Sequence, residues 1–288
     1  MKAEKKLGII ELKRLGIQVR RDIIRMVFEA KSGHPGGSLG CVEYFLALYF
    51  HHLKHNPAHF QMDGIGEGVF ILSNGHITPV YYSVLARSEY FDKKELSTFR
   101  KINSRLQGHP ATAEGLPGIR IATGSLGQGL SVALGVALAK KLNNDNHLVY
   151  ALIGDGEVNE GQIWEAAQFA SHHKIDNIIV AVDRNNKQID GDTREIMDTG
   201  DLAIKFTTFG WEVIDCYAPN DIKSMIEAIK NAKKLTRKRK PVMLILHTIM
   251  GKGVDFMEDT HEFHGKPPNN EQFERAMAQL KETEFGDY

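Results

Sequence analysis

Residues 154–186 constrain the fold more than any other stretch of the sequence. An apolar run over 148–153 ends in the tripeptide GDG, an amphipathic run follows, and a second apolar run over 178–182 ends in the tetrapeptide DRNN. This order predicts a strand, an acidic turn, a helix, a second strand and a turn rich in carboxamides. In a right-handed βαβ unit, both turns lie at the carboxyl ends of parallel strands.

The two turns are expected to bring Asp155 and Asn185 close together, although the residues are far apart in sequence. One offers a carboxylate oxygen and the other an amide oxygen. Hard oxygen ligands from neighbouring loops suit Mg²⁺, which usually completes its coordination shell with phosphate oxygens and water. A purely structural alternative stays open at this point, in which Asp155 caps the following helix and Asn185 forms a turn.

The rest of the chain repeats the alternation of apolar and amphipathic segments. Further strands are predicted at 69–72, 211–216 and 242–246, and helices at 7–31, 39–53, 77–87, 131–142, 199–209, 220–235 and 271–284. Residues 88–120 are expected to be mostly irregular, apart from a short helix near 93–99. Strands that alternate with helices predict an α/β fold, a doubly wound parallel sheet flanked by helices, in a single domain over residues 1–288.

Charge and composition disfavour several classes of protein. Lys plus Arg and Asp plus Glu number 36 each, so the formal net charge is zero and a generally basic nucleic-acid binder is not expected. No apolar run approaches the roughly 20 residues that span a bilayer, and the N-terminus lacks the pattern of a signal peptide. Cys41 and Cys216 are expected to be reduced, buried thiols rather than a disulfide. We therefore expect a cytoplasmic protein without nucleic-acid or membrane partners.

Histidine and glycine motifs mark further candidate positions, each of them ambiguous alone. His34 lies in the sequence SGHPG, where it could be an ordinary loop residue. His76 lies where a predicted strand leads into a helix N-terminus, a place that favours anions. Residues 124–130 combine glycines with a following helix, but they match neither a P-loop nor a dinucleotide fingerprint, so tight helix–sheet packing explains them equally well. A dinucleotide-binding dehydrogenase is disfavoured for the same reason.

Taken together, the motifs resemble those of transketolases. They are SGHPG at 32–36, SNGH at 73–76, GHP at 108–110, TGSLGQG at 123–129, GDGEVNEG at 154–161, Asn185-Asn186 and HGKP at 264–267. A GDG motif with a downstream Asn is typical of thiamine diphosphate enzymes, and the histidine motifs are similar to those of the transketolase branch. The resemblance covers residues 10–270 approximately and implies a thiamine diphosphate-binding domain of the PP type.

A full transketolase resembles this chain plus a pyrimidine-binding domain and a C-terminal domain. The resemblance therefore implies the N-terminal, diphosphate-binding subunit of a two-chain transketolase. The expected reaction moves a two-carbon ketol unit from a ketose phosphate to an aldose phosphate, as in the pentose phosphate pathway. The implied cofactors are thiamine diphosphate and Mg²⁺, or Ca²⁺ or Mn²⁺ in its place. The implied partner is a subunit with the two missing domains, in an α₂β₂ assembly.

The resemblance also assigns roles to individual residues. For the metal, it adds the main-chain carbonyl of Lys187 to the side chains of Asp155 and Asn185. Four histidines would line the reaction site and move protons, for which an unperturbed pKa of about 6.5 suits them. These are His34, His76, His109 and His264. By family position His34 and His264 would face the acceptor's oxygen, and His109 the hydroxyls of the donor.

The residues expected to hold thiamine diphosphate come from the same motifs. They are His76, Gly124, Ser125, Leu126, Gly154, Asp155, Gly156, Glu160, Asn185 and His264. Gly156 is expected to leave its N–H free to face the diphosphate at a helix N-terminus. Glu160 is expected in a carboxylate network at the subunit interface, or alternatively as a first-turn glutamate favoured by the helix dipole.

Two alternative functions stay open at the level of the sequence. Within the same cofactor class, the chain could belong to an enzyme that acts on an unusual sugar, or to a deoxyxylulose-phosphate-type synthase. The histidine set favours ketol transfer over decarboxylation of an α-keto acid. In another class, the chain could be a catalytically silent scaffold or regulatory subunit, although the candidate metal ligands and all four histidines are intact.

Overall fold

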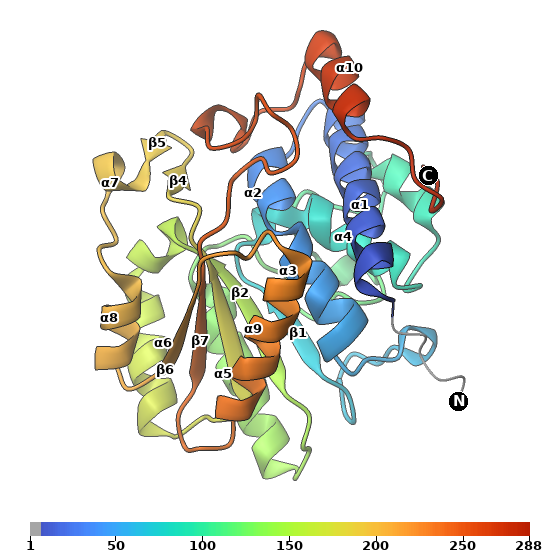
Figure 1. The fold of residues 1–288 in the computed structure, drawn as a ribbon. Coiled ribbons are helices and arrows are strands. Elements are labelled where there is room, and N and C mark those ends of the chain that lie inside the picture. The colour runs from blue at the N-terminus through green and yellow to red at the C-terminus, as the bar shows by residue number, and fades with distance from the viewer. Residues whose placement is uncertain (1–6) are drawn as a thin grey trace.

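A five-stranded parallel sheet forms the centre of the structure, a computed structural model that describes residues 7–288 (Figure 1). In spatial order the strands are β1 (Val69–Leu72), β2 (Val149–Gly154), β3 (Ile178–Asp183), β7 (Val242–Leu246) and β6 (Glu212–Cys216). All neighbouring pairs are parallel. The three central strands are apolar runs of mainly Val, Ile, Leu and Ala, because both faces of such a sheet are covered.

Helices cover both faces of the sheet, and each face has its own hydrophobic core. One core lies under α1 (Ile9–Ala30), α2 (Pro35–Gly40), α3 (Val42–Ala47), α4 (Thr78–Arg87), α9 (Ile222–Leu235) and α10 (Asn270–Gln279). The other lies under α5 (Gln128–Leu142), α6 (Gly161–His172) and α8 (Leu202–Thr208). Successive side chains of a strand point to opposite faces, so Leu152 packs into the first core and Ile153 into the second. This arrangement confirms the predicted α/β fold class.

The remaining elements are short. A two-stranded antiparallel ribbon of β4 (Lys187–Gln188) and β5 (Gly191–Asp192) follows β3, and α7 (Thr193–Ile196) comes directly after it. Short 3-10 helices lie at Pro57–His59, Gly75–Ile77, Lys93–Thr98, Thr112–Glu114, Gly156–Asn159 and His261–Phe263, and a π-helical turn lies at Leu48–His52. Residues 88–120 are otherwise irregular, as the sequence predicts.

Some helix ends differ from the prediction. The segment predicted as one helix at 39–53 is divided into α2, α3 and the π-helical turn at Leu48–His52. The first of these begins already at Pro35, because proline fits the first turn of a helix, where no N–H is required. The helix predicted at 271–284 ends at Gln279. The sequence does not predict the β4–β5 ribbon or α7, because such short segments carry no apolar periodicity.

Two features of the described residues bear on the class of protein. Within residues 7–288, no helix is long and apolar enough to cross a membrane. Cys41 and Cys216 are free and buried, as the sequence predicts. Burial raises the pKa of both thiols above the usual value, so both are protonated at neutral pH.

The register of the central strands brings their carboxyl ends level. Gly154 of β2 is paired with Asp183 of β3, and Asp183 is paired with Leu246 of β7. The N–H of Asp155 then donates to the carbonyl oxygen of Asp183 at 3.1 Å, which carries the ladder one step into the turns. The GDG and DRNN turns therefore begin side by side, as the βαβ pattern predicts.

A buried ion pair joins α1, α4 and the C-terminal segment. Asp22 is fully buried and accepts hydrogen bonds from Ser83 Oγ at 2.7 Å and from two nitrogens of Arg87 at 2.9 and 3.0 Å. The same guanidinium donates to the carbonyl oxygens of Phe285 and Gly286. One cation therefore neutralises the carboxylate and ties three segments together.

Replacing Arg87 by Met should lower the free energy of unfolding by about 3–5 kcal/mol, because the carboxylate of Asp22 would stay buried without the cation that pairs with it. Urea denaturation followed by circular dichroism measures this change. Arg275→Met is a matched control, since Arg275 and its partner Asp255 have side chains that are 56% and 58% exposed, and such pairs contribute about 1 kcal/mol or less. Equal losses in the two variants would contradict a structural role for the buried pair.

Candidate active site

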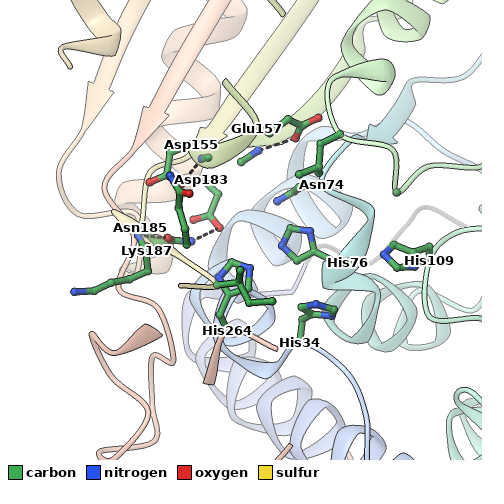
Figure 2. A pocket seen from close by; sticks show the side chains of 16 residues that line it. His34, Asn74, His76, His109, Asp155, Glu157, Asp183, Asn185, Lys187 and His264 are labelled. Atoms are coloured by element: carbon green, nitrogen blue, oxygen red, sulfur yellow. Dashed lines mark hydrogen bonds between the residues drawn. The ribbon is translucent and has the colours of Figure 1, made fainter. Parts of the chain in front are cut away.

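A cavity of about 340 Å³ lies at the carboxyl ends of the central strands (Figure 2). Open α/β sheets bind their ligands in this position. Of the residues that the sequence marks, all but Ser125 and Glu160 line it. The lining ones are His34, His76, His109, Gly124, Leu126, Gly154, Asp155, Gly156, Asn185, Lys187 and His264.

Asp155 is fixed between the two turns. Its side chain is 3% exposed, and its two oxygens accept hydrogen bonds from the N–H groups of Gly156 at 2.8 Å and of Asn186 at 2.7 Å. Asn186 can present its N–H here because it adopts a left-handed φ of 59°, a conformation that Asn tolerates better than most residues. The N–H of Gly156 thus orients the carboxylate, whereas the sequence predicts a free N–H at this position.

Asn185 is oriented by a neighbouring buried acid. Its Nδ2 donates to Asp183 Oδ2 at 3.0 Å, and the hydroxyl of Thr248 donates to the other oxygen of Asp183. Since only the nitrogen of an amide can donate, this contact turns Asn185 Oδ1 away from Asp183. That oxygen accepts from the N–H of Lys187 at 2.9 Å and keeps a further lone pair.

The carboxylates of Asp155 and Asp183 lie in a poorly solvated place. Burial, followed by the charge of Asp183, raises the pKa of Asp155 to about 7, and burial also raises the pKa of Asp183. The nearest lysine on the lining, Lys187, is bound instead to Asp192 at 2.5 Å and to Asp259 at 3.3 Å. Asp155 and Asp183 thus lie at the same end of the cavity, whereas the lysine of the lining forms its salt bridges with other acids.

The donor set at this end of the cavity fits a hard divalent cation. Within residues 7–288, no cluster of three or more His, Cys, Asp or Glu side chains could hold a metal. A carboxylate and an amide oxygen lie on adjacent turns instead, and Mg²⁺ uses few protein ligands when phosphate oxygens supply the rest. The buried excess of negative charge gives a reason for a cation at this place.

The structure brings the four histidines together from four separate segments (Figure 2). The ring centroid of His34 lies 5.0 Å from that of His76, 6.0 Å from that of His264 and 6.5 Å from that of His109. The rings of His76 and His264 stack at 5.3 Å. Nδ1 of His34 and Nδ1 of His264 are buried, without a hydrogen-bond partner among the residues that the structure describes.

Burial keeps the histidine cluster uncharged at neutral pH. It lowers the pKa of His34 to about 4, with further contributions from His264, Arg100 and His109. It lowers the pKa of His76 well below the usual value and also lowers those of His109 and His264. A neutral imidazole has one nitrogen that donates and one that accepts, so the cluster can bind hydroxyl groups and exchange protons with them.

Gly124 and Leu126, from the loop that precedes α5, also line the cavity. Gly124 has φ of 138°, and a Cβ at this position would lie 2.8 Å from the ring of His109, so only glycine fits. Ser125 is exposed and lies outside the lining, because neighbouring residues of the loop face different ways. Glu160 is also exposed, at the start of α6, and it too lies outside the lining.

Five of the lining residues are given no role by the sequence analysis. They are Asn74, Glu157, Asp183, Gln188 and Ile189. Asp183 and Glu157 lie inside the DRNN and GDGE motifs, where an acid next to a turn is most simply a solvated one. Both are instead about 2% exposed, because segments distant in the sequence cover them. Oδ1 of Asn74 is buried without a hydrogen-bond partner among the described residues.

A comparison with protein families decides the relationship. The family described as "Transketolase, thiamine diphosphate binding domain" matches residues 14–283. The chain belongs to the transketolase family. The resemblance of the sequence motifs is therefore confirmed, and the fold around the cavity is the thiamine diphosphate-binding domain of that family.

The relatives include chains of similar length. One of them, a subunit of the apulose-4-phosphate transketolase of Phocaeicola vulgatus, is 35% identical over 266 residues, which cover 91% of each chain. The 6-deoxy-6-sulfo-D-fructose transketolase subunit SqwG of a Clostridium species is 38% identical over 277 residues, with 94% of this chain and 97% of the relative covered. The solved transketolase of Campylobacter jejuni superimposes with a TM-score of 0.87 at 33% identity. The match covers 95% of this chain but only 43% of that transketolase.

The raised pKa of Asp155 has a testable consequence for stability. The carboxyl titrates near pH 7 in the folded chain and near 3.9 in an unfolded one. Between these values the folded state binds the proton that the unfolded state has released, so this group lowers stability as pH rises. The buried histidines act in the opposite direction, since their pKa values are lowered. The difference between the wild type and Asp155→Asn cancels the contribution of the histidines and reports the carboxyl of Asp155 together with its coupling to Asp183.

The free energy of unfolding of Asp155→Asn, relative to that of the wild type, should rise by about 2–4 kcal/mol when the pH is raised from 4 to 7 in the presence of EDTA. If the amide loses a hydrogen bond, the variant is destabilised by the same amount at every pH, and the dependence of the difference on pH is unchanged. Denaturant unfolding at several pH values measures this change, and Asp190→Asn, at an exposed position, is the control. If the difference in unfolding free energy between the variant and the wild type does not vary with pH, the raised pKa of Asp155 is contradicted.

Proposed function

We propose that this chain binds thiamine diphosphate and Mg²⁺ as the N-terminal subunit of a two-chain transketolase. The observation that carries the proposal is the pair of side-chain oxygens of Asp155 and Asn185, held on adjacent turns at the cavity of a transketolase-family domain. Residues 1–288 form one such domain in this proposal. The cavity offers oxygens for a metal at one end and neutral imidazoles along its wall.

The metal is held by the side-chain oxygens of Asp155 and Asn185 and by the main-chain carbonyl of Lys187. Diphosphate oxygens and water complete the ligand set of Mg²⁺, and Ca²⁺ or Mn²⁺ can take its place. The cation also offsets the repulsion between Asp155 and the buried Asp183. This explains why the two acids lie together although no lysine or arginine of residues 7–288 forms a salt bridge with them.

The glycines and the apolar loop shape the space for the cofactor. Gly154 and Gly156 leave the turn without side chains beside the diphosphate. Gly124 and Leu126 contact the thiamine, the first through its backbone and the second through its apolar side chain. Ser125 lies between these two residues in the cofactor-binding loop. Glu160 belongs to a carboxylate network at the subunit interface, which agrees with its exposure in this chain.

The histidines move protons and orient the sugar. When bound, the cofactor supplies the carbanion chemistry that cleaves a ketose and transfers its two-carbon unit. His34 and His264 exchange protons with the oxygen of the acceptor, and His76 and His264 approach the diphosphate. His109, the most exposed of the four, contacts the hydroxyls of the donor at the mouth of the cavity. Because burial keeps the rings neutral, each can accept a proton when an alcohol is deprotonated.

A second polypeptide completes the active site. Two relatives that match this chain along most of their length are named as single subunits of transketolases, and the chain spans 43% of the solved transketolase. We infer a partner with the pyrimidine-binding and C-terminal domains, joined to this chain as an α₂β₂ assembly in the cytoplasm. The substrates are a ketose phosphate and an aldose phosphate of the kind used in the pentose phosphate pathway.

The names of the relatives favour a second candidate substrate class. One is named for apulose 4-phosphate and another for 6-deoxy-6-sulfo-D-fructose. Both names denote ketoses, and the same ketol transfer would apply to them. The chain could therefore serve an unusual sugar with the same cavity and the same histidines.

Mixed with its partner subunit, thiamine diphosphate and Mg²⁺, the chain should transfer a two-carbon unit from a ketose phosphate to an aldose phosphate, and neither subunit alone should do so. Mass spectrometry of the products measures this for common pentose phosphates and for the two unusual ketoses. Consumption of pyruvate instead would indicate a deoxyxylulose-phosphate-type synthase. No transfer in a mixture that binds the cofactor would favour a silent subunit and contradict the proposal.

Replacing Asn185 by Ala should weaken the binding of Mn²⁺ in the presence of thiamine diphosphate by about tenfold or more, because one oxygen ligand is removed. Electron paramagnetic resonance of free Mn²⁺ in the assembled complex reports this affinity without a need for turnover. Asn231→Ala on the exposed face of α9 is the control. Equal affinities in the two variants would argue against Asn185 as a ligand.

A further inference from the structure

Glu157 is a buried acid to which neither the motifs nor the proposed chemistry gives a role. Its side chain lies in the turn after β2 and the residue is 2% exposed. Oε1 accepts a hydrogen bond from the N–H of Gly127 at 2.7 Å and another from the hydroxyl of Ser73. Oε2 accepts from the N–H of Gly154 at 2.9 Å. One carboxylate thus receives three donors from three segments of the chain.

Each of these three segments carries part of the cavity wall. Ser73 follows β1 and precedes Asn74 and His76, which line the cavity. Gly127 ends the loop that contains Gly124 and Leu126 and forms the N-cap of α5. Gly154 ends β2 and leads into the GDG turn. Glu157 therefore lies where the three pieces that must surround one ligand meet.

The contacts between these segments are tight. The end of the 124–127 loop also packs against α6, since Gly127 has φ of 84° and a Cβ on it would lie 2.6 Å from the side chain of Gln162. A Cβ on Gly129 would lie 2.5 Å from Ser73 Oγ, so the first turn of α5 rests directly on the end of β1. A negative charge beside the N-terminus of α5 also complements the dipole of that helix. The carboxylate fastens segments that have little room to shift separately.

The chemistry of the three partners requires an acid rather than an amide. All three donate, and an ionised carboxylate only accepts. An amide of the same shape would turn its NH₂ group toward at least one of the three donors. The hydroxyl of Ser73 can rotate to accept instead, but the N–H groups of Gly127 and Gly154 are fixed by the backbone. One of those two hydrogen bonds would therefore be lost or shared.

We propose that Glu157 is a positioning residue whose carboxylate holds the 124–127 loop and the ends of β1 and β2 in the arrangement that binds thiamine diphosphate. The identity of the ligand rests on the proposed function, whereas the fastening of the three segments does not. If Glu157 only filled space in the core, an amide of equal volume would serve as well. The difference between Glu157 and Gln at this position is therefore the decisive comparison.

The first measurement needs no ligand. Hydrogen exchange of the isolated chain, resolved at the amides of Gly127 and Gly154, should show faster exchange in Glu157→Gln at one or both of them. Glu274→Gln, at an exposed position of α10, should leave both rates unchanged. Unchanged protection in Glu157→Gln would overturn the proposal.

The second measurement uses the chain assembled with its partner subunit and titrated with thiamine diphosphate and Mg²⁺. Glu157→Gln should raise the apparent Kd for thiamine diphosphate about tenfold or more, while Glu274→Gln leaves it unchanged. Equal affinity of Glu157→Gln and wild type would overturn the proposal. If the wild type itself does not bind thiamine diphosphate, the proposed function fails, and the exchange rates still decide whether Glu157 fastens the segments.

A milder variant covers the case in which Glu157→Gln does not fold. Ser73→Ala keeps the carboxylate and its two backbone contacts but releases the end of β1. It should raise the apparent Kd by a smaller factor, about threefold to tenfold, because one neutral hydrogen bond is lost. A Kd equal to that of the wild type in Ser73→Ala would count against the proposal, since the end of β1 would then need no fastening.

Discussion

The register between β2 and β3 is the constraint on which the rest of the structure depends. Because Gly154 and Asp183 are partners in the ladder, the turns that follow them start at the same level. That places the carboxylate of Asp155 within reach of the N–H of Asn186 in the neighbouring turn. Asn185 belongs to the same turn, where it donates to Asp183 two residues before it. A shift of one residue would turn every side chain of a strand to the other face of the sheet. Packing of the strands into the two cores fixes the register, and the register brings together the two turns that carry the candidate metal ligands.

Burial then sets the protonation of the cavity in two opposite directions. Removal of water penalises whichever form of a side chain is charged, so it raises the pKa of Asp155 and lowers those of His34 and His76. An acid that tends to keep its proton and bases that tend to stay neutral therefore occupy one site. A cation at the acidic end would restore the charge of Asp155, because a nearby positive charge favours the carboxylate. The histidines farther along the wall would still remain uncharged.

The sequence could predict what is signalled locally, and it could not predict what depends on distant segments. Strand ends followed by turn residues marked Asp155, because an apolar run and a GDG turn are neighbours in the chain. Ser125 and Glu160 lie in equally clear motifs, yet they are exposed and lie outside the lining of the cavity, since membership of a motif does not decide which residues line a site. Glu157 and Asp183 are buried by segments that come together only in the folded chain. Whether an acid is buried depends on the segments that surround it in the fold, and its neighbours in the sequence do not indicate it.

If the proposed cation and cofactor bind beside these two carboxylates, their supply also affects how long the polypeptide survives. A native state that confines such charges is less stable than the same fold after a cation arrives. Any ligand that binds only the folded chain adds stability by mass action, roughly 2.7 kcal/mol at a hundred times its Kd. Because proteases act on chains that open, scarcity of the ligand would shorten the survival of the protein as well as silence it. A cell that runs short of the ligand would in this way dispose of the chains that it cannot use.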